Sequence, residues 1–362
     1  MSTLYMDGFE RGHDRIGNIM RPNDVHIIHK SEIAAIDSDF LMPVTGNYVL
    51  RLHHATNSPR FMIWAEDVFG DVVTEFYCRW RYQTNEIYGG NLFTAGSHDG
   101  EPLGQFQLAN YNGYPSGTSI CSNAPWIKYG KYQIRAYKWY IFEVWVTMNP
   151  GYCWTTGKGD FELRIDGVEA ASAQNVAMSA GGNFFDQFTW DHGYAQEQLI
   201  DDIVFDSTAA FDMHTSDSAV HWFRPNANGV RTDWIPSQET NYQCVNVDGS
   251  IAQADEAYVV SDRVGDKDSY PLAYDSTNAL TKIKTIQTEH RVEREGKSVP
   301  QNISPYLLIN GSEYTGIEVP QSRPFTGHID PIRVMWDQNP DTLSDWTESD
   351  LLNLELGIEA DT

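Results

Sequence analysis

The chain has 362 residues, of which 25 are Lys or Arg and 50 are Asp or Glu, so its formal net charge at pH 7 is -25. DNA phosphates and anionic lipid repel a chain of this charge, which excludes nucleic acid and membrane surfaces from the expected partners. At this length we expect two domains of roughly 150 to 200 residues each.

The first residues, 1–11, show no basic region followed by an apolar run, so we expect no secretory signal peptide. Nor does any apolar stretch approach the ~20 residues that span a bilayer. We therefore expect synthesis in a reducing cytoplasm, where cysteines stay reduced. The four cysteines are scattered, without a C-x-x-C spacing, and the histidines are dispersed. The sequence predicts no metal site and no cofactor.

Short alternating or aromatic runs separated by Gly, Pro, Asn and Asp recur along the chain, which is typical of an all-β fold. The first long strand is predicted over 73–82. Its even positions are mostly apolar, whereas its odd positions include Glu75, Tyr77, Arg79 and Arg81. Because successive side chains of a strand point to opposite faces, we expect one buried face and one polar face.

Further strands follow in the first half of the chain. They are predicted over 104–109, 139–148, 184–190 and 199–205. Between alternating residues at 161–168 stands Asp166-Gly167, a strong hairpin signal because both residues tolerate a positive φ.

Residues 206–218 are rich in Ser, Thr, Asp and Ala without a clear period, so the domain boundary is expected there. The first domain is predicted over 1–208 and the second, smaller one over 219–362. Short strands are expected in the second domain at 258–261, 280–292 and 306–309. Thr347-Glu-Ser-Asp350 resembles a capping box and predicts one short helix over 348–353.

Residues 1 to about 208 resemble the concanavalin A-like lectin/glucanase family, including its LamG-like members. The resemblance is carried by Trp139–Val146, Phe161–Val168 and Leu199–Phe205. It implies an all-β chain with an N-terminal jelly-roll sandwich, followed by a second β-rich domain with a short C-terminal helix.

Other segments are similar to virion proteins of tailed bacteriophages. These segments are Leu4–Glu10, Tyr242–Val247, Ala257–Val260, Asp268–Tyr270, Trp336–Pro340 and Asp345–Thr347. This resemblance implies a structural protein of the virion that contacts the major capsid or tail proteins. It also implies a homo-oligomer, with a homotrimer expected from the symmetry of such particles.

A retaining glucanase needs two carboxylates about 5 Å apart, normally on one strand face as Glu-x-Asp-x-Glu. The chain has no such run: Glu143 stands between Phe142 and Val144, and Arg164 interrupts Glu162 and Asp166. It also lacks a Gly-x-Ser-x-Gly elbow and a phosphate-binding Gly-x-x-x-x-Gly-Lys loop. The sequence therefore predicts no catalytic residues.

Carbohydrate binding is a second interpretation, because strand faces expected to be exposed combine Arg79, Gln107, Glu143 and Trp145. An aromatic platform beside hydrogen-bonding groups suits a sugar ring. The alternative, which ordinary packing favours, is that Trp145 packs beneath a covering loop while Glu143 pairs with Arg79.

The adjacent pair Asp201-Asp202 offers carboxylate oxygens of the kind that bind calcium. Neighbouring residues of a strand point to opposite faces, so at most one of them would face a given site. A hydrogen bond within a turn or across strands is the favoured interpretation.

Three functions follow as expectations. The first is a non-enzymatic virion protein, most simply a decoration or cement protein on the outside of the head, or else a tail protein. The second is an adhesion protein that binds host or environmental glycans through the jelly roll. The third is an unusual glycan hydrolase that depends on Glu143.

Overall fold

The computed structural model of the chain describes two compact units, Met1–His221 and Trp222–Thr362. The residues described are 3–7, 18–20, 25–36, 39–41, 48–53, 60–65, 68, 72–87, 90–96, 106–119, 126–149, 157–179, 184–191, 197–206, 220–221, 223–245, 257–274, 280, 282–292, 302–316, 319–320 and 331–361. The domain boundary is expected at residues 206–218, and residues 207–218 of this segment are outside the described ranges.

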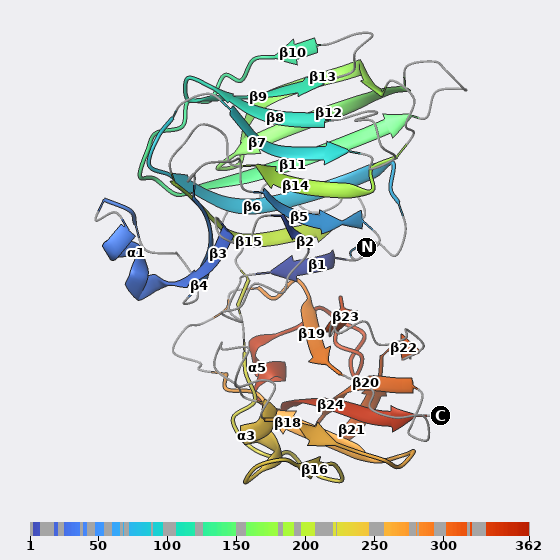
Figure 1. Ribbon diagram of the computed structural model, residues 1–362. Helices are drawn as coiled ribbons and strands as arrows, with labels where there is room; N and C mark the ends of the chain where they lie inside the picture. Colours follow the sequence, from blue (N-terminus) through green and yellow to red (C-terminus); the bar gives the residue numbers. More distant parts are fainter. Residues whose placement is uncertain are drawn as a thin grey trace. The chain divides into compact units, whose positions relative to one another are not determined.

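The expected all-β fold is confirmed, because strands dominate both units and the described helices are short (Figure 1). The helices are α1 (Lys30–Ile36), α3 (Asn241–Val245) and α5 (Glu348–Leu351). None of them has the length and apolar composition needed to cross a membrane.

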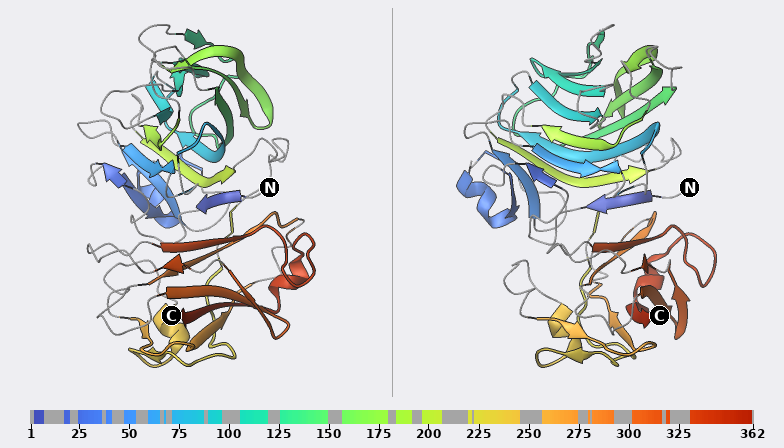
Figure 2. Two further views of the ribbon diagram at one scale, coloured as in Figure 1. Left: turned by 90° about the vertical axis from the view of Figure 1, so that its right-hand side faces the viewer. Right: turned by 45° about the vertical axis from the view of Figure 1, so that its right-hand side comes forward.

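Two antiparallel sheets stack as layers in the first unit (Figures 1 and 2). The eight-stranded sheet has the order β13 (Val168–Ser179), β12 (Gly157–Ile165), β11 (Tyr140–Asn149), β6 (Glu75–Thr84), β15 (Glu197–Asp206), β4 (Tyr48–His53) and β3 (Val25–His29), with β1 (Thr3–Asp7) paired to β15. The seven-stranded sheet has the order β10 (Trp126–Lys128), β9 (Tyr114–Ser119), β8 (Phe106–Tyr111), β7 (Gly90–Gly96), β14 (Gln187–Asp191), β5 (Arg60–Trp64) and β2 (Asn18–Met20). These sheets form a jelly-roll-like sandwich.

The core of the first unit lies between these sheets and is rich in aromatic rings. Trp80 stacks on Phe93 of the opposite sheet, with ring centroids 5.1 Å apart, and on Phe142 of the neighbouring strand at 5.5 Å. Gly117 of one sheet faces Phe161 of the other, and a Cβ at this position would lie 2.4 Å from the Phe161 ring. The wide aromatic faces therefore hold the two sheets together.

The strands predicted in the first half correspond to β6, β8, β11, β14 and β15. The predicted hairpin turn is confirmed as well, since Asp166 and Gly167 have φ angles of 52° and 75° between β12 and β13. The even positions of β6 face the core as expected, with Phe76, Cys78 and Trp80 fully buried.

The expectation of one solvent-exposed polar face on β6 is wrong. Tyr77, Arg79 and Arg81 are all buried, on the face of the eight-stranded sheet that points away from the core. Acidic side chains of β11 and β15 lie opposite these residues, so neutralised charges make this burial tolerable.

The second unit contains three smaller antiparallel sheets. One has the order β18 (Lys267–Pro271), β24 (Leu354–Asp361), β20 (Asn302–Ile309) and β21 (Ser312–Thr315), with β22 (Val319–Pro320) paired to β20; the others are β16 (Ile235–Pro236) with β17 (Val259–Val260), and β19 (Ile286–Arg291) with β23 (Pro331–Trp336). Leu307, Trp336 and Trp346 form the centre of its larger hydrophobic cluster. The predicted C-terminal helix is confirmed as α5, and its capping box joins Thr347 to Asp350.

Two helices were not predicted, because they are too short to show a helical period. In α1 the buried Ile33 belongs to a small hydrophobic cluster, and α3 buries Asn241 and Cys244. Of the four cysteines, the structure describes Cys78 and Cys244, both buried and neither in a disulfide.

Candidate functional site

A row of alternating charges crosses four strands on the outer face of the eight-stranded sheet. In register, Arg79 of β6 lies beside Glu143 of β11, which lies beside Arg164 of β12, which lies beside Glu169 of β13. We call these four residues the charge row. Arg79 and Glu143 are 1% and 0% exposed, Arg164 is partly buried, and Glu169 at the other end of the row is exposed.

Glu143 accepts a hydrogen bond from a side chain next to the row. The Tyr77 hydroxyl donates a 2.7 Å hydrogen bond to Glu143 Oε1, and burial together with this carboxylate raises the pKa of Tyr77. Burial lowers the pKa of Arg79, while the nearby negative charges of Asp202 and Glu143 oppose that shift. Glu143 is thus a buried hydrogen-bond acceptor that lies opposite Arg79 in register. The ion pair of Glu143 with Arg79 stays a prediction.

Asp201 and Asp202 lie where β15 is distorted. The register of β15 against β6 shifts between Asp201 and Val204, and Asp202 has a φ of 51°. Asp202 Oδ2 accepts a 2.6 Å bond from Arg81 Nε, and Oδ1 accepts one of 3.0 Å from the Val220 backbone N–H. The cross-strand interpretation is confirmed for Asp202, whose two oxygens already have protein donors.

Trp145 is half-buried and lies on the same face of β11 as Glu143. Its indole Nε1 donates a 2.9 Å bond to Glu75 Oε1, and its ring packs against a small cluster of Tyr77, Val204 and Val220. At least one side of the ring is therefore used for packing, against a cluster that includes Val220 near the end of the first unit.

Gln107 does not belong to this face. It lies on β8, in the seven-stranded sheet, whereas Arg79, Glu143 and Trp145 lie in the eight-stranded one. The expectation that all four residues share exposed strand faces is wrong, because Arg79, Glu143 and Gln107 are buried. Strand alternation identifies the face of a residue but does not reveal its sheet or what covers that face.

Gln107 instead belongs to a row on the outer face of the seven-stranded sheet. In register, Met62 of β5 lies beside Thr189 of β14, then Thr94 of β7, then Gln107 of β8. The chain neighbours of these residues point into the core: Phe61, Ile63, Phe188, Trp190, Phe93, Ala95, Phe106 and Leu108. The four residues, which we call the threonine row, therefore point away from it.

The threonine row is nearly inaccessible although it is on an outer face, with exposures of 4% to 8%. The hydroxyls of Thr94 and Thr189 are buried and have no hydrogen-bond partner in the described part of the chain. Leaving a buried hydroxyl unsatisfied costs about 1–3 kcal/mol. Each hydroxyl offers one donor and two acceptor positions, so the row suits an uncharged polar ligand.

Sequence reasoning found only Gln107 of this row. Threonine is a common strand residue, so a single Thr in a strand carries no functional signal. A weak signal is the repeated Phe-Thr followed by a core residue, in Phe93-Thr94-Ala95 and Phe188-Thr189-Trp190.

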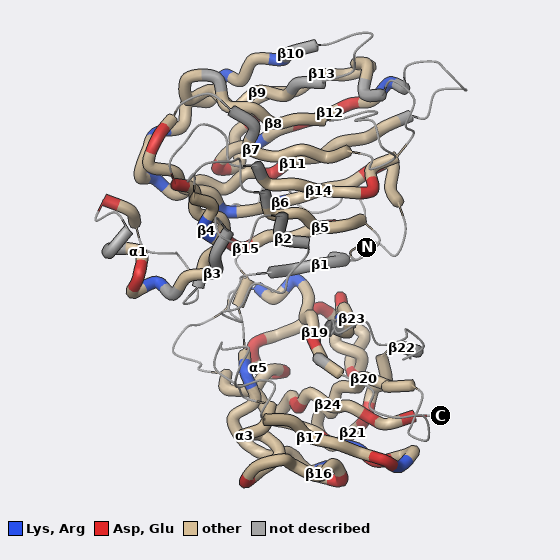
Figure 3. The backbone as a smooth tube through the Cα atoms, viewed as in Figure 1, with Lys and Arg blue, Asp and Glu red and all other residues tan. Residues whose placement is uncertain are grey.

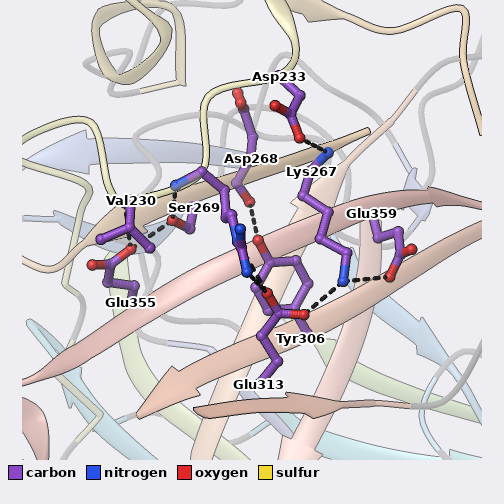
Figure 4. Close-up of polar contacts among 10 residues, drawn as sticks. Val230, Asp233, Lys267, Asp268, Ser269, Tyr306, Glu313, Glu355 and Glu359 are labelled. Carbon is purple, nitrogen blue, oxygen red and sulfur yellow. Dashed lines mark hydrogen bonds and ion pairs between the residues drawn. The ribbon is translucent and has the colours of Figure 1, made fainter. Parts of the chain in front are cut away.

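A second polar cluster lies on the outer face of the second unit's largest sheet (Figure 4). Lys267 Nζ binds Glu313 at 2.6 Å and Glu359 at 3.3 Å, and Arg231 binds Glu313 at 2.8 Å. Lys267 also lies 5.5 Å from the centroid of the Tyr306 ring. We call these five residues the Lys267 cluster.

The charges of the Lys267 cluster satisfy one another. The hydrogen bond from Lys267 holds the pKa of Glu313 below its usual range, and the same bond raises the pKa of Lys267. The backbone preceding β16 is tied to this sheet as well, since Gly229 N–H donates to the Ser269 carbonyl and Val230 N–H to Glu355 Oε2. These backbone bonds and the Arg231–Glu313 pair of the cluster therefore attach the loop before β16 to the sheet.

The described residues contain no group of three or more His, Cys, Asp or Glu side chains placed to hold a metal ion.

No family model and no curated protein matches the sequence. Among solved structures, the binding domain of botulinum neurotoxin serotype D/C VPI 5993 aligns at 10% identity and a TM-score of 0.40, covering 94% of this chain and 79% of that one. Alginate lyase vAL-1 from Chlorella virus aligns at 10% identity and 0.35, covering 51% and 100%. Trypanosoma rangeli sialidase aligns at 11% and 0.32, covering 53% and 29%. Likenesses below a TM-score of 0.5 assign neither a family nor an activity.

Proposed function

We propose that this protein is a non-catalytic structural component of a tailed-phage particle, most simply a decoration or cement protein on the outside of the head. The observation that carries its non-catalytic character is the burial of Glu143 within the charge row, bonded to Tyr77. A substrate does not reach a carboxylate with 0% exposure, so the hydrolase expectation loses its candidate residue.

The location on a particle rests on the sequence resemblance of both halves to tailed-phage virion proteins. The charge of -25 supports an outer position, because an acidic chain is repelled by packaged DNA and attracted by a basic protein surface. A tail position is the alternative placement within the same function. The homotrimer that the resemblance implies belongs to this proposal.

Mass spectrometry of purified particles tests the proposal, after heads and tails have been separated on a density gradient. We expect the chain in the head fraction, in a fixed ratio to the major capsid protein. Recovery of the chain from the tail fraction would instead indicate that the protein is located on the tail. Its absence from purified particles would contradict the virion role.

A second candidate function is glycan binding through the threonine row. The hydroxyls of Thr94 and Thr189, which lack a partner in the described part of the chain, favour it, since a sugar hydroxyl is both donor and acceptor. Because these residues are only 6% and 4% exposed, this function requires that the cover over the row move aside when the glycan binds. Gln107, next to Thr94 in register, adds an amide to the same row.

A broad glycan array with the purified protein tests this second candidate. We expect binding to be at least tenfold weaker in a Thr94→Val/Thr189→Val double variant and unchanged in Trp145→Ala, because Trp145 lies on the other sheet. Failure of the wild-type protein to bind any glycan would contradict it and leave the particle role untouched.

A further inference from the structure

The ribbon formed by β16 and β17 in the second unit has an apolar face on its outside. Ile235 pairs with Val260, and these two side chains are 65% and 48% exposed. Tyr258, two residues before Val260 and hence on the same face, is 54% exposed. The opposite face is occupied, since Val259 packs against the hydrophobic cluster that contains Trp234 and Ile303.

Three large apolar side chains gathered on so short a ribbon differ from the single exposed ones found on any surface. Contiguous apolar patches of this kind mark interaction surfaces in water-exposed proteins. The outer face of the ribbon is therefore expected to be covered by another molecule.

The ribbon also has an open edge. In the described structure β17 has one sheet neighbour, β16, so the other edge of Val259–Val260 faces no strand. A two-stranded sheet is only marginally stable by itself, and an open strand edge is a template for another strand. Both residues of β17 are valines, which favour strand pairing.

Charge identifies the strand that fits this edge. Residues 235–237 and 258–261 are all uncharged in a chain of net charge -25, and Figure 3 shows this stretch of the tube without charge colours. Two copies repel each other through acidic surfaces, so they approach most readily through an uncharged one. A basic partner would gain nothing from this patch.

The charges at the ends of the ribbon do not oppose a second copy in antiparallel orientation, because Asp262 neutralises Arg263 at one end. The exposed Glu239 follows β16, whereas Arg263, 82% exposed with its neighbour Asp262 at 3.9 Å, follows β17 and so lies toward the opposite end. A two-fold axis at Val259 brings the Arg263 end of one ribbon toward the Glu239 end of the other.

We propose that β17 pairs antiparallel with β17 of a second copy of this chain, which joins the two ribbons into one four-stranded sheet. The contact is isologous, and Ile235, Tyr258 and Val260 of the two copies form a continuous apolar face. It gives a dimer, in place of the homotrimer that the resemblance implies, and it does not depend on where on a particle the protein is located.

Sedimentation equilibrium of the full chain over a wide concentration range tests the pairing. The wild-type protein is expected to reach about 82 kDa, twice the chain mass of 41.0 kDa. Val260→Lys places a charge on the pairing edge and is expected to weaken dimerisation at least tenfold. Val168→Lys is the matched control, because this valine of the first unit is 54% exposed, close to the 48% of Val260. It should leave the dimer intact.

Circular dichroism establishes that each variant is folded. A variant that carries both Tyr258→Cys and Val260→Cys adds a positive readout. An axis at Val259 sets Tyr258 of one copy opposite Val260 of the other, so oxidation should link the two chains, whereas Val168→Cys should stay single. A wild-type protein that remains a monomer, or an oligomer that Val260→Lys leaves unchanged, would overturn the proposal. A trimer that survives Val260→Lys would overturn it in the same way.

Discussion

Arg81 of β6 and Asp202 of β15 form an ion pair of 2.6 Å on the outer face of the eight-stranded sheet, with side-chain exposures of 8% and 0%. Asp202 reaches this position because β15 is irregular there and its backbone has a positive φ. The same carboxylate accepts the Val220 backbone N–H, so it links two strands to the end of the first unit.

Replacing Arg81 with Met should therefore destabilise the first unit strongly. The change leaves Asp202 buried without its cation, which typically costs about 3–5 kcal/mol. Urea denaturation measures the loss. Arg164→Met is the matched control, because the Arg164–Glu162 pair is partly exposed, and it should cost no more than about 1 kcal/mol. Equal losses in both variants would show that burial of the pair is unimportant.

Thr94→Val and Thr189→Val should leave stability unchanged or raise it by about 1 kcal/mol, because each removes a buried hydroxyl that lacks a partner. Thr84→Val is the contrasting change. The Thr84 hydroxyl donates to the Glu197 carbonyl at 3.1 Å, so its loss should lower stability by about 1 kcal/mol. Thermal unfolding distinguishes these outcomes, and a clear loss in the Thr94 variant would mean that its hydroxyl is satisfied in solution.

Stability should fall on acidification because of His290 on β19. In the described part of the chain, the buried His290 Nε2 has no hydrogen-bond partner. Burial lowers the pKa of His290 to about 4, although the negative charge of Glu289 acts in the opposite direction. In the unfolded chain this pKa is about 6.5. The unfolded state then binds the proton more readily, so this stability is fully present above pH 6.5 and is lost as the pH falls toward 4.

Unfolding free energies of wild type and His290→Gln, measured from pH 8 to pH 4, check this dependence. Subtracting the unfolding free energy of the variant from that of the wild type at each pH removes the contribution of the carboxylates common to both. The difference should decrease steadily between pH 6.5 and 4. A flat difference would contradict the lowered pKa of His290.

Gly357→Ala should destabilise the second unit, since a Cβ at this position would lie 2.1 Å from the Tyr306 ring. The ring cannot turn away freely, because its hydroxyl donates to the Asp268 carbonyl at 3.0 Å. Overpacking of this kind costs about 1–3 kcal/mol. In a double-mutant cycle, Tyr306→Leu should relieve part of the cost, and strictly additive losses would contradict the clash.

Local patterns in the sequence determined strands β6, β8, β11, β14 and β15, the Asp166-Gly167 turn and the C-terminal helix. In each case neighbouring residues carry the signal: alternation in β6 and β11, positive φ in the turn, and the capping box Thr347–Asp350 at the start of α5. Helices α1 and α3 lacked such a signal, because one or two turns are too short for a helical period.

The tertiary structure alone decided where the candidate site residues lie. Alternation correctly placed Arg79 and Glu143 on one face of their strands, yet only sheet pairing puts them side by side, and only packing buries them. Thr94 and Thr189 are 95 residues apart and meet solely because β7 and β14 are neighbours in the seven-stranded sheet. Period-two patterning selects a face within a strand, whereas the identity of the neighbouring strand and the cover over a face depend on contacts between residues distant in the chain.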